Sequence, residues 1–294
     1  MTTTGTAESR LTSWRNPMYR LATTFITLGL LTAAPSAGAD EPHGDPAELA
    51  KREYEQVMAL TPDIDNGRRV YLTCAVCHRP EGWGTPDGSY PQIAGQWREV
   101  IIKQLADIRA RHRDNPLMYP FSLTRILGGP QNMADVAAYV AALPMTANNG
   151  VGPGVDLELG ARLYAKHCAD CHGERGEGKP AKPTPAIAAQ HFPYLMGQFD
   201  AIRDGRRKNA NPEMIEQIAE FTLRDQVAVL DYTSRLRPAP EKLAAENWLN
   251  PDFPNYVRET MGMPPLPPPP VVPLMPGAPP FPIAPAQTPS AVAE

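Results

Sequence analysis

Cysteine is scarce in this chain: only four occur among 294 residues, and all four fall within two short motifs. The chain also lacks an apolar run of the roughly 20 residues that a membrane-spanning helix needs. Lys and Arg do not outnumber Asp and Glu, at 28 against 32, so the composition gives no indication of nucleic-acid binding. Alternating strand and helix patterns are missing as well, which argues against a βαβ fold of the thioredoxin type.

The four cysteines occur in two copies of the pentad Cys-x-x-Cys-His, at residues 74–78 and 168–172. This spacing is typical of covalent c-type haem attachment, in which two thiols add to the haem vinyl groups. The adjoining histidine is then placed under the iron as its proximal ligand. The motifs therefore predict two covalently bound haem c groups, attached through Cys74, Cys77, Cys168 and Cys171, with His78 and His172 as iron ligands.

Three other interpretations of the cysteine pairs are possible. A structural zinc site built from both pairs would use four ligands, but it leaves the histidine after each pair without a role. A redox-active Cys-x-x-Cys pair would sit near a βαβ pattern. Two structural disulfides would suit an exported protein. Haem attachment is favoured because both pairs carry the histidine and lie in matching sequence contexts.

The N-terminal segment predicts export. Three arginines, at positions 10, 15 and 20, precede the apolar run 21–34, and Ala37-Gly38-Ala39 follows as a small-residue cleavage site. This order is typical of a cleavable secretory signal peptide, and an uncleaved membrane anchor is the alternative. Its removal would leave 25 basic and 31 acidic residues, a net charge of about −6. We expect a periplasmic protein, either soluble or loosely membrane-associated, because thioether attachment of haem takes place outside the bacterial plasma membrane.

The chain repeats internally in a fixed order. Residues 67–71 before the first pentad match residues 160–164 before the second, and 91–96 match 185–190. Gln96 and Gln104 are eight residues apart, as are Gln190 and Gln198. The segments 115–118 and 211–214 then both read Asn-Pro-x-Met. Two copies of one small haem domain are therefore expected, each of which needs the porphyrin to complete its core.

Helical spacing of apolar residues predicts an all-α structure, with helices near residues 100–108, 136–140, 195–202 and 227–232. Glycine- and proline-rich loops, 81–90 and 173–185, are expected to wrap the haem edges. From Pro264 to Pro289, 13 of 26 residues are proline, so this tail is expected to be extended or disordered. The expected divisions are a signal peptide (1–39), a first haem domain (40–147), a linker (148–155), a second haem domain (156–237) and a C-terminal extension (238–294).

The sixth iron ligand decides what each haem can do. A methionine opposite the histidine raises the reduction potential and closes the iron to small molecules, which favours electron transfer. Met118 and Met214 are the only methionines at equivalent positions in the two repeats, so they are the predicted ligands; core filling is the alternative role of any methionine. His112 and His191 would allow bis-histidine ligation, but neither is repeated, and solvent-facing or propionate-contacting roles are expected for them.

Taken together, the ordered motifs resemble the two-haem cytochrome c4 family of class I c-type cytochromes, over about residues 64–237. The resemblance implies two tandem class I cytochrome c domains packed with pseudo-twofold symmetry, with haem propionates facing each other. It implies the same ligands by position: the four cysteines, His78 and His172, and Met118 and Met214. Arg79, where the second repeat has Gly173, departs from the family pattern, as do the proline-bound segment 115–121 and the C-terminal extension.

The function expected from this resemblance is a periplasmic carrier of single electrons between a membrane or periplasmic donor and a terminal oxidase or reductase. It is expected to make transient contacts with membrane complexes and to have no catalytic residues. Four arginines are candidates to neutralise the charge of the haem propionates: Arg98, Arg109, Arg203 and Arg206. The alternative is that each lies on a helix face exposed to solvent.

Two other functions are compatible with two haem motifs. The chain could be a dihaem oxidoreductase of the thiosulfate dehydrogenase or peroxidase type, but that chemistry needs an open or unusually ligated iron. It could also be the electron-accepting subunit of such an enzyme, docked through the proline-rich tail. A plain disordered spacer is the alternative role of that tail.

Overall fold

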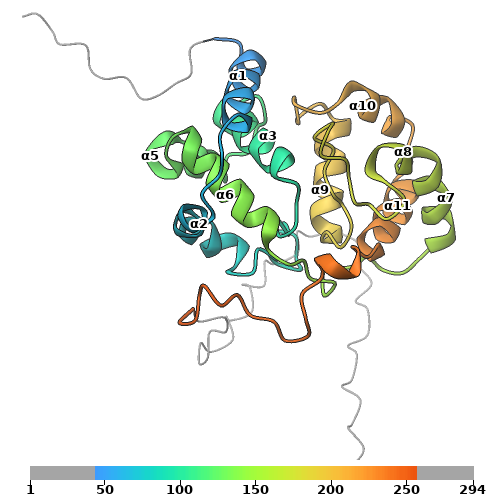
Figure 1. Ribbon diagram of the computed structural model, residues 1–294. Helices are drawn as coiled ribbons and strands as arrows, with labels where there is room; N and C mark the ends of the chain where they lie inside the picture. Colours follow the sequence, from blue (N-terminus) through green and yellow to red (C-terminus); the bar gives the residue numbers. More distant parts are fainter. Residues whose placement is uncertain (1–43, 257–294) are drawn as a thin grey trace, which may run out of the picture. The chain divides into compact units, whose positions relative to one another are not determined.

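The computed structural model describes residues 44–256, which form eleven α-helices, a short 3-10 helix and no β-strand beyond two isolated bridges (Figure 1). This confirms the all-α prediction. Among the described helices, none has the length and apolar character needed to cross a membrane. The expected signal peptide (1–39) and the proline-rich tail (264–289) lie outside the described residues.

The first half of the chain contains six helices: α1 (Pro46–Met58), α2 (Ile64–His78), α3 (Arg98–Arg109), α4 (Tyr119–Ser122), α5 (Thr124–Leu127) and α6 (Pro130–Ala142). The second half contains α7 (Leu157–His167), α8 (Ala169–His172), α9 (Phe192–Arg203), α10 (Pro212–Ile218), α11 (Leu223–Arg235) and the 3-10 helix η1 (Pro240–Lys242). Helices α3, α6, α9 and α11 confirm the four helices predicted from apolar spacing. No sequence prediction covers α1, which packs against α3 and α6.

Each half is built around one close crossing of two helices. In the first half α2 packs on α6, and in the second α7 packs on α11. A Cβ atom at Gly67 would lie 2.2 Å from the carbonyl oxygen of Asp135, and one at Gly160 would lie 2.1 Å from that of Ala228. Only glycine permits backbones to approach so closely, which explains why both repeats carry glycine at this position.

Buried tyrosines continue the same crossings. The rings of Tyr71 and Tyr139 lie 5.2 Å apart in the first half, and those of Tyr164 and Tyr232 lie 5.7 Å apart in the second. Such offset aromatic pairs stabilise a packed interface beyond the area that they bury. The repeat of these tyrosines in the sequence therefore marks a repeated helix-packing contact.

The loop after each pentad has the same backbone hydrogen bonds in both halves. A glycine six residues after the histidine donates its N–H to the histidine carbonyl oxygen, and a later isoleucine donates to a second glycine. These bonds are Gly84 to His78 (3.0 Å) and Ile93 to Gly82 (2.7 Å), then Gly178 to His172 (2.7 Å) and Ile187 to Gly176 (2.7 Å). All four glycines have positive φ, which explains the glycine content of the loops.

Glutamines join the two halves in a pseudo-twofold pattern. The side chain of Gln96 accepts from the N–H of Ala186 and donates to its carbonyl oxygen, at 2.9 Å in both cases. The equivalent Gln190 does the same to Gln92, at 3.0 and 2.8 Å. These reciprocal bonds satisfy buried backbone groups across the interface and support the predicted symmetry of the tandem domains.

The segment 148–155 is a packed connection. The side-chain amide of Asn149 is buried and donates to the carbonyl oxygens of Gln190 (3.0 Å) and Ser234 (2.9 Å). The carbonyl oxygen of Gly150 accepts from the N–H of Phe192 (2.7 Å). Its glycine- and asparagine-rich composition predicted only a linker, whereas its hydrogen bonds tie it to the second half.

Residues 238–256, here called the C-terminal strap, return from the second half to cover the first. The buried side chain of Asn250 donates to the carbonyl oxygen of Pro80 (2.6 Å) and to the hydroxyl of Tyr139 (3.0 Å). Phe253 belongs to the buried core of the first half, and Trp248 packs on Trp83 at 5.8 Å between ring centroids. Part of the expected C-terminal extension is therefore packed on the core of the first half.

We predict that Gly67→Val will destabilise the protein by at least about 2 kcal/mol, because the new side chain must push α2 away from α6. Equilibrium unfolding in denaturant, followed by circular dichroism, measures the loss. Gly129→Ala is the control, because it sits at the start of α6 with no atom within 4 Å of its added Cβ. It should change stability by less than about 1 kcal/mol. Equal effects of both variants would contradict the role of the close crossing.

Candidate haem-binding site

One cavity of about 1260 Å³ extends through both halves and is lined by both pentads. His78 and Met118 line it in the first half, and His172 and Met214 line it in the second. Most of the remaining wall is aliphatic or aromatic, with residues such as Ile101, Leu105, Leu127, Leu195, Phe199 and Ile202. A large apolar cavity with a thiol pair, an imidazole and a thioether in each half has the chemistry needed to hold two haem c groups.

Each pentad histidine is held by the proline thirteen residues later. The Nδ1–H of His78 donates to the carbonyl oxygen of Pro91 (3.0 Å), and that of His172 donates to the carbonyl oxygen of Pro185 (2.9 Å). These bonds set the tautomer and leave Nε2 as the nitrogen available to a metal. Burial lowers the pKa of both histidines and so favours the neutral imidazole, which is the form that binds a metal.

The residue after each histidine is anchored by the buried tyrosine of the helix crossing. Tyr71 donates its hydroxyl to the carbonyl oxygen of Arg79 (2.8 Å), and Tyr164 donates to that of Gly173 (2.7 Å). Arg79 has a φ of 66° and Gly173 a φ of 83°. The departure of Arg79 from the family pattern therefore leaves the local backbone unchanged, at the steric cost of a side chain in the left-handed region.

No disulfide joins the four cysteines, all of which lie in the part of the chain that the structure describes. Burial raises the pKa of Cys74 and that of Cys168 to about 12. Residues 44–256 contain no group of three or more His, Cys, Asp and Glu side chains that could hold a metal ion.

Met118 and Met214 are the only methionines within residues 44–256 that line the cavity. The N–H of Met118 donates to the side chain of Asn115 (3.1 Å), just before α4. Met214 lies inside α10. Asn211 caps this helix by accepting from the N–H of Glu213 (2.8 Å), and the proline at position 212 suits a first helical turn.

The other described methionines pack elsewhere. Met133 is completely buried in the core of the first half, and Met145 is buried against Gly95. Met58 accepts a weak hydrogen bond from Arg98 (3.8 Å), and Met196 packs on the core of the second half. The core-filling role that any methionine can have applies to these four residues.

The arginines expected to meet haem propionates have other partners. Arg98 donates to the carbonyl oxygens of Val57 and Leu60, and Arg109 pairs with Glu53. Arg203 pairs with Asp200 (2.9 Å). Arg206 lines the cavity, but its side chain is 62% exposed and pairs with Asp204 (3.3 Å). Two arginines that were not among these candidates, Arg113 and Arg207, also line the cavity.

A constant sequence spacing could have identified these two arginines. Arg207 follows Arg113 by 94 residues, the spacing that also separates His172 from His78 and Gln198 from Gln104. The repeat therefore extends through this pair.

The histidines outside the pentads have three different surroundings. His112 donates from Nδ1 to Asp107 (2.9 Å), and His167 interacts through Nδ1 with Gln217 (2.8 Å). His191 is only 1% exposed, so the expected solvent-facing role is wrong for it. Its Nδ1 accepts from the N–H of Gly150 (3.1 Å), and its Nε2–H donates to the carbonyl oxygen of Trp83 (2.7 Å).

Comparison with known proteins agrees with this geometry. A family model described as cytochrome c matches residues 64–144 and again residues 157–226, about half of the chain. The chain belongs to the cytochrome c family. It carries two tandem cytochrome c domains, which bind two covalent haem c groups, and it is a dihaem cytochrome of the c4 type.

Three relatives match this cytochrome over most of their own length. Cytochrome c4 of Thiocapsa roseopersicina is 33% identical over 178 residues, which cover 55% of this chain and 86% of the relative. Cytochrome c4 of Azotobacter vinelandii is 27% identical over 190 residues, which cover 59% and 89%. The thiosulfate dehydrogenase electron acceptor of Stutzerimonas stutzeri strain A1501 is 30% identical over 195 residues, covering 60% and 88%.

Solved structures show the same fold. Reduced cytochrome c4 from Pseudomonas stutzeri superposes with a TM-score of 0.54 at 23% identity, covering 60% of this chain and all of the other. Thiosulfate dehydrogenase from Marichromatium purpuratum superposes with a TM-score of 0.53 at 25% identity, covering 62% of this chain and 44% of the other. These matches confirm the predicted tandem cytochrome c architecture.

The buried His191 predicts a pH dependence of stability. Burial lowers its pKa from the ordinary value of 6.5, and Arg79 lowers it further against the opposing effects of Trp83 and Asp87. The folded state therefore binds this proton less readily than the unfolded state. The stabilisation is complete above pH 6.5 and is lost as the pH falls below that value, by at most about 1.4 kcal/mol per pH unit.

Denaturant unfolding of the cytochrome between pH 5 and 8 measures this effect. His191→Gln should flatten the dependence, because glutamine does not titrate in this range. His167→Gln, at a histidine that interacts only with side chains of the second half, is the control and should keep the wild-type slope. Identical slopes for the wild type and His191→Gln would contradict the prediction.

Proposed function

We propose that this dihaem electron carrier binds one haem iron through His78 and Met118 and the other through His172 and Met214. The haem groups would be attached through Cys74 and Cys77 in the first half and through Cys168 and Cys171 in the second. The observation that carries the proposal is that the two repeated methionines are the only described methionines lining the cavity shared with the pentads.

When bound, the haem supplies one-electron oxidation and reduction at its iron. The residues of the chain hold it covalently, orient the imidazole through a proline carbonyl oxygen and surround it with apolar side chains. A thioether on the far side would leave no coordination position for a substrate and would raise the reduction potential. This arrangement suits transfer of single electrons and does not suit chemistry at an open iron.

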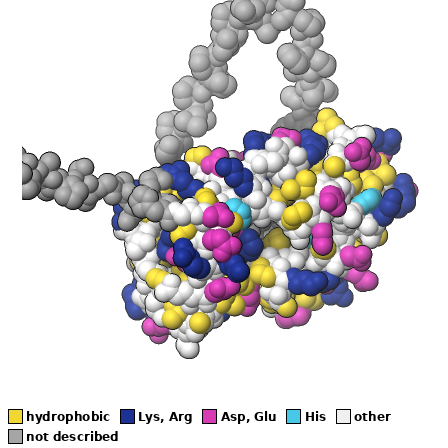
Figure 2. All heavy atoms as spheres, turned by 90° about the horizontal axis from the view of Figure 1, so that it is seen from above, with side chains coloured by type: hydrophobic (Ala, Val, Ile, Leu, Met, Phe, Trp, Pro, Cys, Tyr) yellow, Lys and Arg dark blue, Asp and Glu magenta, His cyan; other side chains and the backbone are white. Residues whose placement is uncertain are grey.

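We further propose that the carrier works in the periplasm, between a membrane or periplasmic donor and a terminal oxidase or reductase. The signal peptide expected at residues 1–39 supports export. Figure 2 shows basic and acidic side chains interspersed over the face that it draws. This surface favours brief docking through mixed contacts over selection of a partner with one strong charge.

Replacement of the methionines tests the ligands. We predict that Met118→Leu and Met214→Leu will each remove about half of the near-infrared sulfur-to-iron absorbance of the oxidised protein, and that the double variant will lose the band. Leucine keeps a similar volume but has no sulfur. Met58→Leu and Met196→Leu are controls, one from each half, that should retain the full band. Retention of the band in the double variant would overturn the proposed ligation and, with it, the closed-iron carrier.

A second candidate function is that of electron acceptor for a thiosulfate dehydrogenase, supported by the 30% identity to such an acceptor from Stutzerimonas stutzeri. We predict that the oxidised protein will be reduced by thiosulfate only when the dehydrogenase of that organism is present. The visible absorbance of reduced haem measures the rate. Reduction by thiosulfate alone would favour an enzyme instead, and no reduction in either case would contradict this acceptor role.

A further inference from the structure

Two arginines, one from each half, share their hydrogen-bond acceptors at the boundary between the domains. Arg113 follows α3 and donates to Gln104 (2.5 Å), to Gln198 (2.9 Å) and to the hydroxyl of Tyr194 (3.2 Å). Arg207 follows α9 and donates to the same two glutamine oxygens, at 2.9 Å for Gln198 and 3.2 Å for Gln104. These five residues are called the arginine cluster below.

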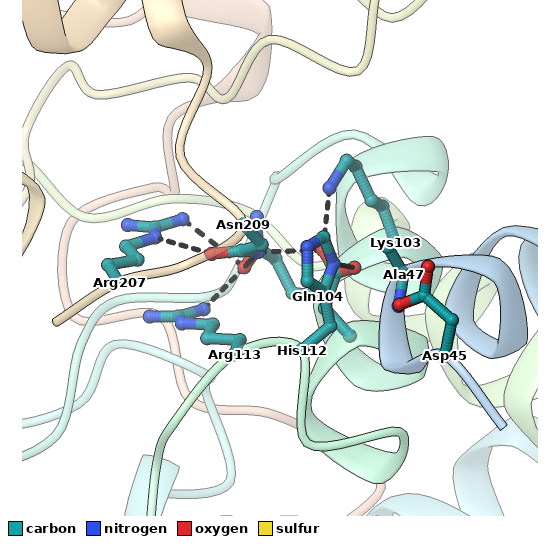
Figure 3. Close-up of polar contacts among 9 residues, drawn as sticks. Asp45, Ala47, Lys103, Gln104, His112, Arg113, Arg207 and Asn209 are labelled. Carbon is teal, nitrogen blue, oxygen red and sulfur yellow. Dashed lines mark hydrogen bonds and ion pairs between the residues drawn. The ribbon is translucent and has the colours of Figure 1, made fainter. Parts of the chain in front are cut away.

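The cluster connects the domains crosswise. Arg113 belongs to the first half and donates to two residues of α9 in the second. Arg207 belongs to the second half and donates to a residue of α3 in the first. Each guanidinium therefore lies within hydrogen-bond reach of both halves, as Figure 3 shows for the approach of Arg113 and Arg207 to Gln104.

Every acceptor of these guanidinium groups is neutral. The third side chain bound to Arg207 is also an amide, that of Asn209 (3.2 Å). Neither arginine has a carboxylate partner within residues 44–256. The nearest carboxylate in the network, Asp107, is reached only through Asn209 (2.6 Å) and already pairs with Lys103 (2.6 Å) and His112 (2.9 Å).

The environment opposes two positive charges. Arg113 is only 7% exposed. Burial, followed by the charge of Arg113, lowers the pKa of Arg207 to about 10. Although burial alone would raise it, the pKa of Tyr194 is lowered by the charges of Arg113 and Arg207. Two like charges, one buried and one half-buried, that share neutral acceptors need an anion to compensate them.

The cavity supplies a place for that anion. All five residues of the arginine cluster line the same cavity as the two pentads. Each haem c carries two propionate carboxylates, and guanidinium groups bind carboxylates through paired, charge-assisted hydrogen bonds. Haem groups attached at both pentads would therefore have their carboxylates in the same cavity as the uncompensated cations.

We propose that the arginine cluster is a single carboxylate-binding site shared by both haem groups, so that either arginine influences the reduction potential of both irons. The proposal rests on attachment of the two haem groups at the pentads. Arg113 and Arg207 act here as positioning and charge-compensating residues. A positive charge near the haem disfavours the ferric form, which has one more positive charge than the ferrous form, and so raises the potential.

The experiment is a spectroelectrochemical titration of the complete dihaem protein carrying Arg113→Gln or Arg207→Gln. In each single variant we expect both couples to shift to lower potential, with a change of about tenfold in the reduction equilibrium of at least one, equivalent to about 59 mV. Arg224→Gln is the matched control, because it removes the same charge from an exposed ion pair with Asp156 in the second half. It should leave both potentials at their wild-type values.

Near-isosteric variants keep the test informative if an arginine variant does not fold. Gln198→Glu and Gln104→Glu place a carboxylate between the two guanidinium groups, where it competes with the haem carboxylates, so both potentials should again fall. Arg113→Lys and Arg207→Lys keep the charge and should restore most of the wild-type potentials.

The outcomes separate this proposal from the proposed ligation. Potentials that stay at wild-type values in both the arginine and the glutamate variants would overturn the shared site. A shift of only one couple, the one in the same half as the substituted residue, would also overturn it. The near-infrared sulfur-to-iron band reports methionine ligation independently, so an unchanged band with unmoved potentials would refute the cluster and leave the ligands standing.

Discussion

The hydrogen bond from the Nδ1 of each pentad histidine to a proline carbonyl oxygen constrains the whole architecture. The imidazole can present Nε2 to the cavity only if the loop of thirteen residues returns to the same place in both halves. Glycines with positive φ make that return possible, and the helix that carries the pentad must start at a fixed point. The Gly67 and Gly160 crossings provide that point by locking α2 on α6 and α7 on α11. A shift in any of these contacts would move a ligand.

The two halves are equivalent in the residues that line and support the cavity and different in the segments packed around them. The tyrosine anchors, the loop hydrogen bonds and the cavity methionines recur in both. The first half alone has α1 and the C-terminal strap, which places Phe253 in its core and Asn250 against Pro80, next to the strained backbone of Arg79. These additions stabilise the haem loop in which this chain departs from its relatives, so the two domains need not unfold with equal ease.

The contact between the domains contains neutral groups, which hold the domains together, and charged groups, which set the electrostatic environment of the cavity. Gln96 and Gln190 satisfy backbone groups across the boundary, and His191 joins Trp83 to Gly150 with both ring nitrogens. These bonds fix one domain on the other without adding charge. Arg113 and Arg207 add charge where the cavity passes from one half to the other. An interface of this kind suits a carrier whose two redox centres must keep a constant separation and share one electrostatic environment.

The sequence by itself determined the covalent chemistry, the duplication, four of the longer helices and the pair of repeated methionines. Each of these depends on short spacings or on a repeat, which one chain displays directly. Only the tertiary structure decided the roles of α1, the strap, the buried His191 and the two shared arginines. Their partners lie far away along the chain, and a histidine or arginine on its own does not reveal whether it meets water, a carbonyl oxygen or a cavity. Burial and pairing arise from the packing of distant segments, so local pattern predicts the ligands of each half but not how the halves are joined.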